Sequence, residues 1–334
     1  MHKYKIAVIG CGAIFSRHLQ AIKNNQEHYK LIGLYDADKN KLQQLTTELN
    51  VKAYKDEDEL FNDEEINCVA VITPSHVHYE QMRRALINNK NVIVEKPATF
   101  LSSELDDIEQ LAKKNNVNVF TILQVRLNPS LIAVKEFIQS GLFGKIRNVS
   151  LVQRWQRPLE YFTGWRGGMS SGGGVLREFS IHYLDALLLL VGAPNKVSNA
   201  NFYKTKFMSG DVFDTIYAHL DFGGFGGNIE ISIGAEPRNL ECSLSIMSEN
   251  GFIKLGGKSL DEIIEMQFLD SRLIDKLKTY EDEALKNRSV SLASTGASPY
   301  HPELYRQIIL NPDSFRLRQT YDVVKLIENI YSFA

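Results

Sequence analysis

Apolar residues in the first 124 positions follow two alternating patterns. Short continuous apolar runs predict strands, and the stretches between them carry apolar residues at helical spacing. Strands are expected at 5–10, 30–36, 66–74, 91–97 and 117–124, and helices at 18–25, 36–50, 79–89 and 102–116. Such alternation predicts an α/β domain over residues 1–124, built on a doubly wound parallel sheet with helices on both faces.

The pattern changes in the second part of the chain. A helix is expected at 128–141, a strand at 145–155, a helix from the glycine turn at 172–174 to Leu190, and a final helix at 314–333. Several strand-like runs lie between them, at 197–204, 214–222, 227–234, 240–247 and 251–257. Hairpins are expected at 220–230 and at Asn250-Gly251. Residues 125–334 are therefore predicted to form an α+β domain with a large, mainly antiparallel sheet that is open on one face.

Composition narrows the class of protein. The chain has 334 residues, 44% of them hydrophobic and 23% charged, with a formal net charge of −2. No block of Lys or Arg suggests a nucleic-acid or membrane partner. The longest apolar stretch, from Ala186, is too short to cross a bilayer, and the N-terminal run is too short for a secretory leader. Three widely spaced cysteines indicate neither a disulfide framework nor a zinc site, so a cytoplasmic protein without a bound metal is expected.

A glycine turn follows the first predicted strand. Gly10 and Gly12 fit the first two positions of G-x-G-x-x-G, while Phe15 occupies the third. Gly10 permits a tight turn, and Gly12 lets the backbone, including that of Ala13 and Ile14, approach a pyrophosphate at a helix N-terminus. Asp36, at the end of the second strand, can accept hydrogen bonds from an adenosine ribose and would repel a 2′-phosphate, which favours NAD over NADP. The alternative is a structural turn capped by an aspartate.

The stretch "VIVEKPATF" places charges at the end of a buried strand. Glu95 and Lys96 follow three β-branched residues, and Pro97 fixes the next backbone angle. A surface salt bridge would be worth only about 0–1 kcal/mol and would not need such strict placement. The pair is therefore a candidate functional group, with an exposed Glu–Lys pair as the alternative.

Four segments carry a family resemblance: "GCGAIFSRH", "VITPSHVHY", "VEKPATF" and "GGGVLREFSIHYLD". They resemble the glucose–fructose oxidoreductase and inositol dehydrogenase (Gfo/Idh/MocA) family. The segments "QVRLNPSL", "GWRGGMSSGGG" and "YHPELYRQII" look closest to its UDP-N-acetylglucosaminuronic acid 3-dehydrogenases. The resemblance implies an N-terminal Rossmann domain, a catalytic Lys96, a Glu95 that holds the nicotinamide ribose, and a homodimer or homotetramer. It also implies a catalytic His182, although Glu178 and Ser180 depart from the family's Asp-x-Gly-x-His run.

Alcohol oxidation needs a hydride acceptor, a proton acceptor and a group that stabilises the developing alkoxide. NAD would accept the hydride, His182 suits proton transfer near neutral pH, and Lys96 can place positive charge beside the oxygen. Helical spacing puts Glu178 and Asp185 on the same face as His182, so Glu178 is expected to orient His182 or share its proton. The alternative for His182 is a structural histidine in a core helix.

The remaining predicted site residues form two groups. Arg forks suit carboxylates and phosphates, and aromatic rings can stack on a sugar or uracil. The alternative to substrate binding is that the arginines are scattered over the surface and that the aromatic residues fill the core. The first group is expected to line the cofactor site: Thr73, Pro74, His76 and Gln124. The second is expected to face the substrate: Arg126, Arg157, Trp165, Arg166, Asp185, His301 and Tyr305, in a region that also holds Arg154, Trp155, Tyr161 and Arg177.

Together these features predict an NAD-dependent dehydrogenase of a sugar secondary hydroxyl, most specifically C3 of a UDP-linked N-acetyl hexuronic acid. A dehydrogenase of free cyclitols or monosaccharides is one alternative. A catalytically silent NAD-binding sensor is the other, because Glu178 and Ser180 depart from the family pattern.

Overall fold

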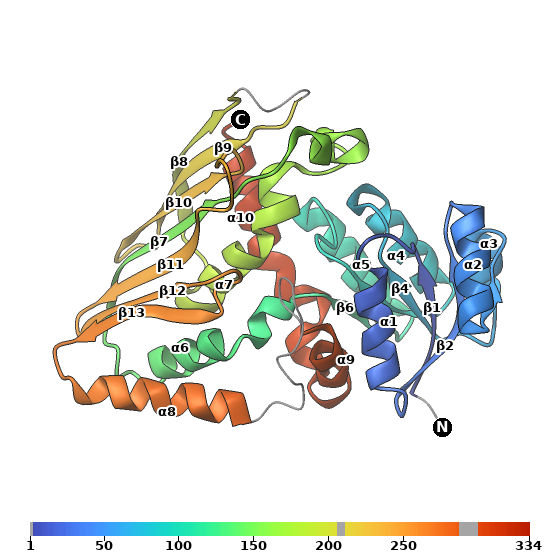
Figure 1. Ribbon diagram of the computed structural model, residues 1–334, viewed down its shortest axis with the longest axis horizontal. Coiled ribbons are helices and arrows are strands. Elements are labelled where there is room, and N and C mark those ends of the chain that lie inside the picture. Colours follow the sequence, from blue (N-terminus) through green and yellow to red (C-terminus); the bar gives the residue numbers. More distant parts are fainter. Residues whose placement is uncertain (1–2, 206–210, 287–299) are drawn as a thin grey trace. The chain divides into compact units, whose positions relative to one another are not determined.

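The computed structural model describes residues 3–205, 211–286 and 300–334, which form two compact units (Figure 1). The first unit contains the described chain up to Leu123 together with Tyr300–Tyr321. The second contains the described residues from Gln124 onward together with Asp322–Ala334. The first unit therefore includes a late segment, 300–321, that the sequence analysis assigned to the second domain.

The first unit is built on a six-stranded sheet in which every pair of neighbouring strands is parallel. The strand order is β3-β2-β1-β4-β5-β6, the order of a dinucleotide-binding doubly wound sheet. The strands are β1 (Tyr4–Ile9), β2 (Tyr29–Tyr35), β3 (Lys52–Ala53), β4 (Cys68–Val71), β5 (Asn91–Val94) and β6 (Val119–Thr121). The helices are α1 (Phe15–Asn24), α2 (Lys39–Leu49), α3 (Glu57–Asn62), α4 (His78–Ile87), α5 (Ser102–Lys114) and α9 (His301–Leu310).

The second unit is built on a seven-stranded sheet, in the order β13-β12-β11-β7-β10-β9-β8. All neighbours are antiparallel except β7 and β10, which are parallel. The strands are β7 (Ile146–Arg154), β8 (Lys196–Tyr203), β9 (Thr215–Asp221), β10 (Gly226–Ser232), β11 (Glu241–Ser248), β12 (Gly251–Gly256) and β13 (Glu262–Phe268). Helices α6 (Pro129–Gln139), α7 (Ile181–Val191), α8 (Arg272–Lys286) and α10 (Tyr321–Tyr331) lie on one side of this sheet in Figure 1.

Both predicted hairpins are confirmed: β9 pairs with β10, and β11 pairs with β12 across Asn250-Gly251. The predicted fold class is also confirmed, a parallel doubly wound sheet plus a mostly antiparallel α+β unit. The short elements β3 and α3, and the later β13 and α8, were not predicted. β3 has two residues, too few to show a period.

One predicted helix contains an irregularity, and another was too long. The helix expected from the glycine turn to Leu190 is present, but a π-helical turn, Leu176–Ser180, interrupts its α-helical geometry before α7. The helix expected at 314–333 begins only at Tyr321, after two short 3-10 turns, Pro312–Phe315 and Leu317–Thr320. Phe315 and Leu317 are buried in these turns, so their apolar character reflects core packing rather than a continuous helix.

The other face of the second sheet exposes both apolar and charged side chains. Tyr217 and Met247 are 40% and 53% exposed, and Arg154 pairs with Glu230 and Glu241 of the neighbouring strands. This mixed surface is the face that the sequence analysis expected to be open. Among the described residues, every helix is either too short or too polar to serve as a membrane span.

Candidate active site

The glycine turn has the geometry of a phosphate-binding loop. Gly10 has φ +93°, and a Cβ there would lie 2.9 Å from the carbonyl oxygen of Ile72, so glycine is required for both backbone angle and space. A Cβ at Gly12 would meet nothing within 4 Å. Open space above Gly12, directly before the first turn of α1, is what the approach of a pyrophosphate requires. The residue at the third position of the motif, Phe15, is buried at the start of α1.

Asp36 connects the end of β2 to this turn. Its Oδ2 accepts a hydrogen bond from the backbone N–H of Cys11 at 2.6 Å, and its Oδ1 accepts one from that of Asp38 at 2.8 Å. The aspartate therefore supports the turn, as the structural alternative proposed. It also leaves a half-buried carboxylate beside Gly12, where a ribose hydroxyl could donate.

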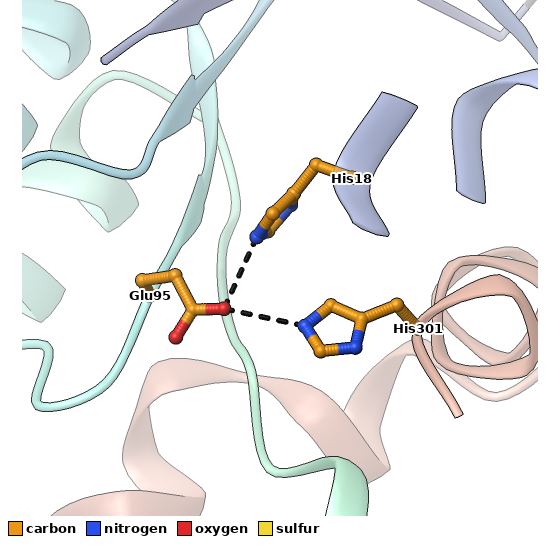
Figure 2. Close-up of side chains that lie close together, drawn as sticks. All are labelled: His18, Glu95 and His301. Carbon is orange, nitrogen blue, oxygen red and sulfur yellow. Dashed lines mark hydrogen bonds and ion pairs between the residues drawn. The ribbon is translucent and has the colours of Figure 1, made fainter. Parts of the chain in front are cut away.

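Glu95 lies at the end of β5 and is held by two histidines. Its Oε1 is 3.1 Å from Nε2 of His18 and 3.3 Å from Nε2 of His301 (Figure 2). Its Oε2 accepts a hydrogen bond from the backbone N–H of Lys96 at 3.0 Å. Burial would raise the pKa of Glu95, but hydrogen bonds from the two histidines hold that pKa well below its ordinary value. Glu95 is thus not the exposed partner of a surface pair.

His18 was not identified from the sequence, although a signal was present. It lies on the same face of α1 as Phe15 and Ile22, and all three are buried. A histidine on a buried helical face needs a polar partner. Its Nδ1 is 2.8 Å from the hydroxyl of Tyr305, which is fully buried. In this structure Tyr305 supports His18 and has no exposed surface to offer to a substrate.

The segments that follow β4 and β5 are joined through His78. Its Nδ1 is 2.8 Å from the carbonyl oxygen of Pro97, and its Nε2 is 2.8 Å from that of Thr73. His78 begins a helix, α4, while His76 lies exposed in the preceding 3-10 turn. Lys96 is half-buried between Glu95 and the cis-linked Pro97. The predicted cofactor residues of the first unit therefore cluster at the carboxyl ends of β1, β2, β4 and β5.

In the second unit, His182 is buried in the first turn of α7. Its Nε2 is 3.3 Å from the side-chain nitrogen of Gln124. The amide oxygen of Gln124 is buried and has no hydrogen-bond partner. Exchanging the two ends of the amide would let that oxygen accept a hydrogen bond from Nε2–H of His182, so Gln124 can pair with either tautomer of the ring.

Glu178 lies in the π-helical turn and not in an α-helix with His182, because the turn Leu176–Ser180 departs from 3.6-residue spacing. Its Oε1 accepts a hydrogen bond from the hydroxyl of Tyr161 at 2.7 Å and pairs with Nε of Arg166 at 3.3 Å. Glu178, predicted to orient His182 or share its proton, thus holds two residues of the predicted substrate region, Tyr161 and Arg166. Ser180, the other departure from the family run, is buried and donates to Gln153 at 2.6 Å.

The arginines of the predicted substrate region differ in their surroundings. Arg126 pairs with Asp185, and Arg154 pairs with Glu230 and Glu241 on the open face of the sheet. Arg177 is buried beneath the ring of Tyr331. Arg157 stacks over Trp155 at 4.6 Å, and Arg166 over Trp165 at 4.4 Å. Arg157 and Arg166 are the half-buried members whose guanidinium groups lie against half-buried aromatic rings, whereas Arg177 is itself buried.

Comparison with known proteins agrees with this arrangement. Residues 4–123 match the oxidoreductase family with an NAD-binding Rossmann fold, and residues 131–254 match the GFO/IDH/MocA C-terminal domain. The chain is 26% identical to the scyllo-inositol 2-dehydrogenase (NAD(+)) of Bacillus subtilis over 268 residues, which cover 76% of this chain and 74% of the relative.

Solved structures show the same likeness. The WlbA dehydrogenase of Bordetella pertussis, crystallised with NADH and UDP-GlcNAcA, is 25% identical, with a TM-score of 0.87 over 100% of this chain and 96% of that one. Levoglucosan dehydrogenase, in a complex with NADH and L-sorbose, is 18% identical and shares the fold with a TM-score of 0.83 over 99% of this chain and 96% of that one.

The fold and the glycine turn define an NAD-binding oxidoreductase. Open space above Gly12, the helix N-terminus behind it and the carboxylate of Asp36 all fit that cofactor. The chain belongs to the Gfo/Idh/MocA family of NAD-dependent sugar and polyol dehydrogenases.

Proposed function

We propose that the protein oxidises a secondary hydroxyl of a nucleotide sugar, at C3 of a UDP-linked N-acetyl hexuronic acid. This choice rests on structural similarity to a dehydrogenase that was crystallised with NADH and UDP-GlcNAcA. The similarity extends over essentially the whole of both chains. Arg157 and Arg166, each lying against an aromatic ring, supply cations of the kind that suit an acidic and phosphorylated sugar. The proposal also includes a homo-oligomer that forms through the open face of the second sheet. It further includes a reducing compartment, which suits the three free thiols.

The proposed mechanism assigns one task to each residue. NAD supplies the hydride acceptor. Lys96, fixed by the buried end of β5, stabilises the oxygen on which negative charge develops. His182 receives the hydroxyl proton, and Gln124 holds the ring through its amide. Glu178 keeps Tyr161 and Arg166 in place beside the substrate.

A second candidate function is the oxidation of a free cyclitol. It is favoured by the 26% identity to a scyllo-inositol 2-dehydrogenase over three quarters of each chain, 76% and 74%. The cation of Arg157 argues against it, because an uncharged polyol gives that guanidinium nothing to neutralise, whereas Arg166 already pairs with Glu178.

One assay separates these functions. Purified protein and NAD are incubated with UDP-GlcNAcA, UDP-GlcNAc, scyllo-inositol and myo-inositol, and the absorbance of reduced nicotinamide is followed. The proposal expects turnover of the acidic UDP-sugar alone. Turnover of inositol alone would support the second candidate. NADH binding without turnover of any sugar would support the silent sensor.

Two variants test the machinery. Lys96→Ala and His182→Ala should each lose turnover by about a hundredfold or more, since general acid–base catalysis typically contributes that much. Both should still bind NADH. The matched controls are Lys113→Ala, exposed at the end of α5, and His28→Ala, half-exposed before β2, which should turn over like the native protein. A native rate in Lys96→Ala or His182→Ala would remove that residue from the mechanism.

A further inference from the structure

One carboxylate oxygen of Glu95 is shared by two imidazole rings from distant parts of the sequence. Figure 2 shows His18 reaching it from α1 and His301 from α9, with Nε2 to Oε1 distances of 3.1 and 3.3 Å. The side chains of His18, His301 and Glu95 are 0%, 3% and 11% exposed. All three lie in the first unit, to which α9 returns after the chain has formed the second unit.

The hydrogen bonds fix where the protons lie. An ionised carboxylate only accepts hydrogen bonds, so both rings must present Nε2–H to Glu95. Nδ1 of His18 is then an acceptor and receives the hydroxyl proton of Tyr305 at 2.8 Å. Nδ1 of His301 is buried with no hydrogen-bond partner, which favours a neutral ring because a second N–H would have no acceptor. Glu95 is therefore an anion held by two neutral donors.

These three side chains also have the composition of a metal site, and their donor atoms lie within 4.8 Å of one another. Their hydrogen bonding gives a sufficient account of the geometry. A metal-bound histidine usually donates its other ring N–H to an oxygen, and His301 has no such acceptor. Positioning of Glu95 is therefore the function that the cluster supports best.

The cluster leaves Glu95 with limited accepting capacity. A carboxylate offers about four lone-pair sites. Two donors face Oε1, and the backbone N–H of Lys96 faces Oε2, which leaves one site on Oε2. A hydroxyl that approached this oxygen would find an acceptor whose direction is already fixed, so little conformational freedom would be lost on binding.

We propose that His18 and His301 are positioning residues for the cofactor: they hold Glu95 ionised and correctly oriented to accept a ribose hydroxyl of NAD. This inference rests on the proposed function, and on the contact between Glu95 and the nicotinamide ribose that the family resemblance implies. It gives α9 a part in cofactor affinity, although this helix lies almost at the end of the chain.

A double-mutant cycle tests the inference. The dissociation constant of NADH is measured by nicotinamide fluorescence for Glu95→Gln, His18→Leu, His301→Leu and the doubles that combine each histidine variant with Glu95→Gln. Each single variant should weaken NADH binding by about tenfold, the effect of one charge-assisted hydrogen bond. In the Glu95→Gln background the histidine changes should add little, because they act through Glu95. Fully additive effects would overturn the inference.

Rescue separates positioning from a general packing defect. His18→Gln and His301→Gln keep an N–H donor near the position of Nε2 and should recover part of the affinity that the Leu variants lose. If the Leu variants do not fold, the Gln variants still allow the positioning role to be tested. His28→Gln, in the same unit but half-exposed, is the matched control and should bind NADH like the native protein. Equal losses in the Gln and Leu variants would contradict a positioning role.

The pH profile gives an independent readout. Besides His18 and His301, the groups that face Glu95 are Lys96, His78 and Tyr305. In His18→Leu, burial should raise the pKa of Glu95 because one donor is lost. The ratio of variant to native dissociation constants should then grow as the pH falls from about 8 to about 5.5. A ratio independent of pH would count against the inference.

The outcomes also separate this inference from the proposed function. If Glu95→Gln binds NADH and turns over normally, the ribose contact is wrong and the inference fails with it, while the sugar dehydrogenase assay stands. If Glu95→Gln weakens NADH binding but neither histidine variant does, only the positioning role fails.

Discussion

Arg126 and Asp185 form a two-pronged ion pair, with Nε 2.7 Å from Oδ2 and Nη2 2.6 Å from Oδ1. The Asp185 side chain is 3% exposed and that of Arg126 is 13% exposed. The pair attaches the 3-10 turn Gln124–Leu127 to α7, and so holds Gln124 near His182. Arg126 and Asp185, which the sequence assigned to the substrate, therefore largely neutralise each other's charge.

Breaking this pair should destabilise the protein more than it affects substrate affinity. In Asp185→Leu the buried guanidinium keeps its charge without its main partner, so the free energy of unfolding should fall by about 3 kcal/mol. The double variant Arg126→Met/Asp185→Leu should recover much of this loss, because no uncompensated charge remains. Urea denaturation of the single and double variants measures both effects. An Asp185→Leu protein of native stability with a raised KM would instead restore the substrate role.

The two glycines of the cofactor turn should respond differently to alanine. Gly10→Ala combines a left-handed backbone angle, φ +93°, with a Cβ 2.9 Å from the Ile72 carbonyl oxygen, so it should lower the melting temperature. Gly12→Ala places its Cβ in open space and should melt like the native protein, but the methyl group would occupy the proposed pyrophosphate position. Its NADH affinity should fall by at least about tenfold, the effect of one displaced charge-assisted contact.

Thermal unfolding and NADH titration of both variants check this contrast. Normal NADH affinity in Gly12→Ala would show that the cofactor does not approach the turn closely. Normal stability in Gly10→Ala would show that the turn can adopt another backbone conformation.

Replacement of Asp36 should change the choice of cofactor. Asp36→Asn keeps an oxygen that can accept the hydrogen bond from Cys11, but it removes the negative charge that opposes a 2′-phosphate. The ratio of the NADPH to the NADH dissociation constant should therefore fall by about tenfold or more, the effect of roughly 1.4 kcal/mol. Asp38→Asn, which also lies beside the turn, is the matched control. An unchanged ratio in Asp36→Asn would mean that Asp36 only supports the loop.

The local sequence pattern predicted helices and strands well wherever apolar residues recurred regularly along the element. The parallel sheet was predicted from runs such as Cys68–Val71, in which every residue is buried. The π-helical turn before α7 was not predicted, because it inserts a residue into a helix whose apolar spacing remains almost continuous. That insertion is also why Glu178 could not be placed from its distance to His182 along the sequence.

Long-range partners were the main difficulty for the site. Glu95 was singled out by its place at the end of a buried strand, but its partners lie 77 and 206 residues away. No local period relates such positions. His301 was assigned to the substrate because its segment resembled part of a substrate domain, whereas α9 folds back onto α1 in the first unit.

His78 makes the stability of the protein sensitive to acid. Burial lowers the pKa of His78 below the ordinary histidine value, against the opposing effect of the Pro97 and Thr73 carbonyl groups. The unfolded chain regains a pKa of about 6.5 and therefore binds more protons than the native state below that pH. The free energy of unfolding should decrease as the pH falls from about 6.5, by up to about 1.4 kcal/mol per pH unit for each such group. His18, whose pKa burial also lowers, contributes in the same direction.

The measurement compares urea unfolding of native protein and His78→Gln between about pH 7 and about pH 5.5, the range in which histidine titrates. The variant should be less stable at both pH values, because a flexible amide replaces a fully buried ring that joins the segments after β4 and β5. Its loss of stability toward acid should nevertheless be smaller than that of the native protein, since one buried neutral histidine is gone. His28→Gln, at a half-exposed position before β2, should keep the native slope. A native protein that gained stability toward acid, with the gain abolished in His78→Gln, would show instead that the two carbonyl groups hold His78 as an imidazolium.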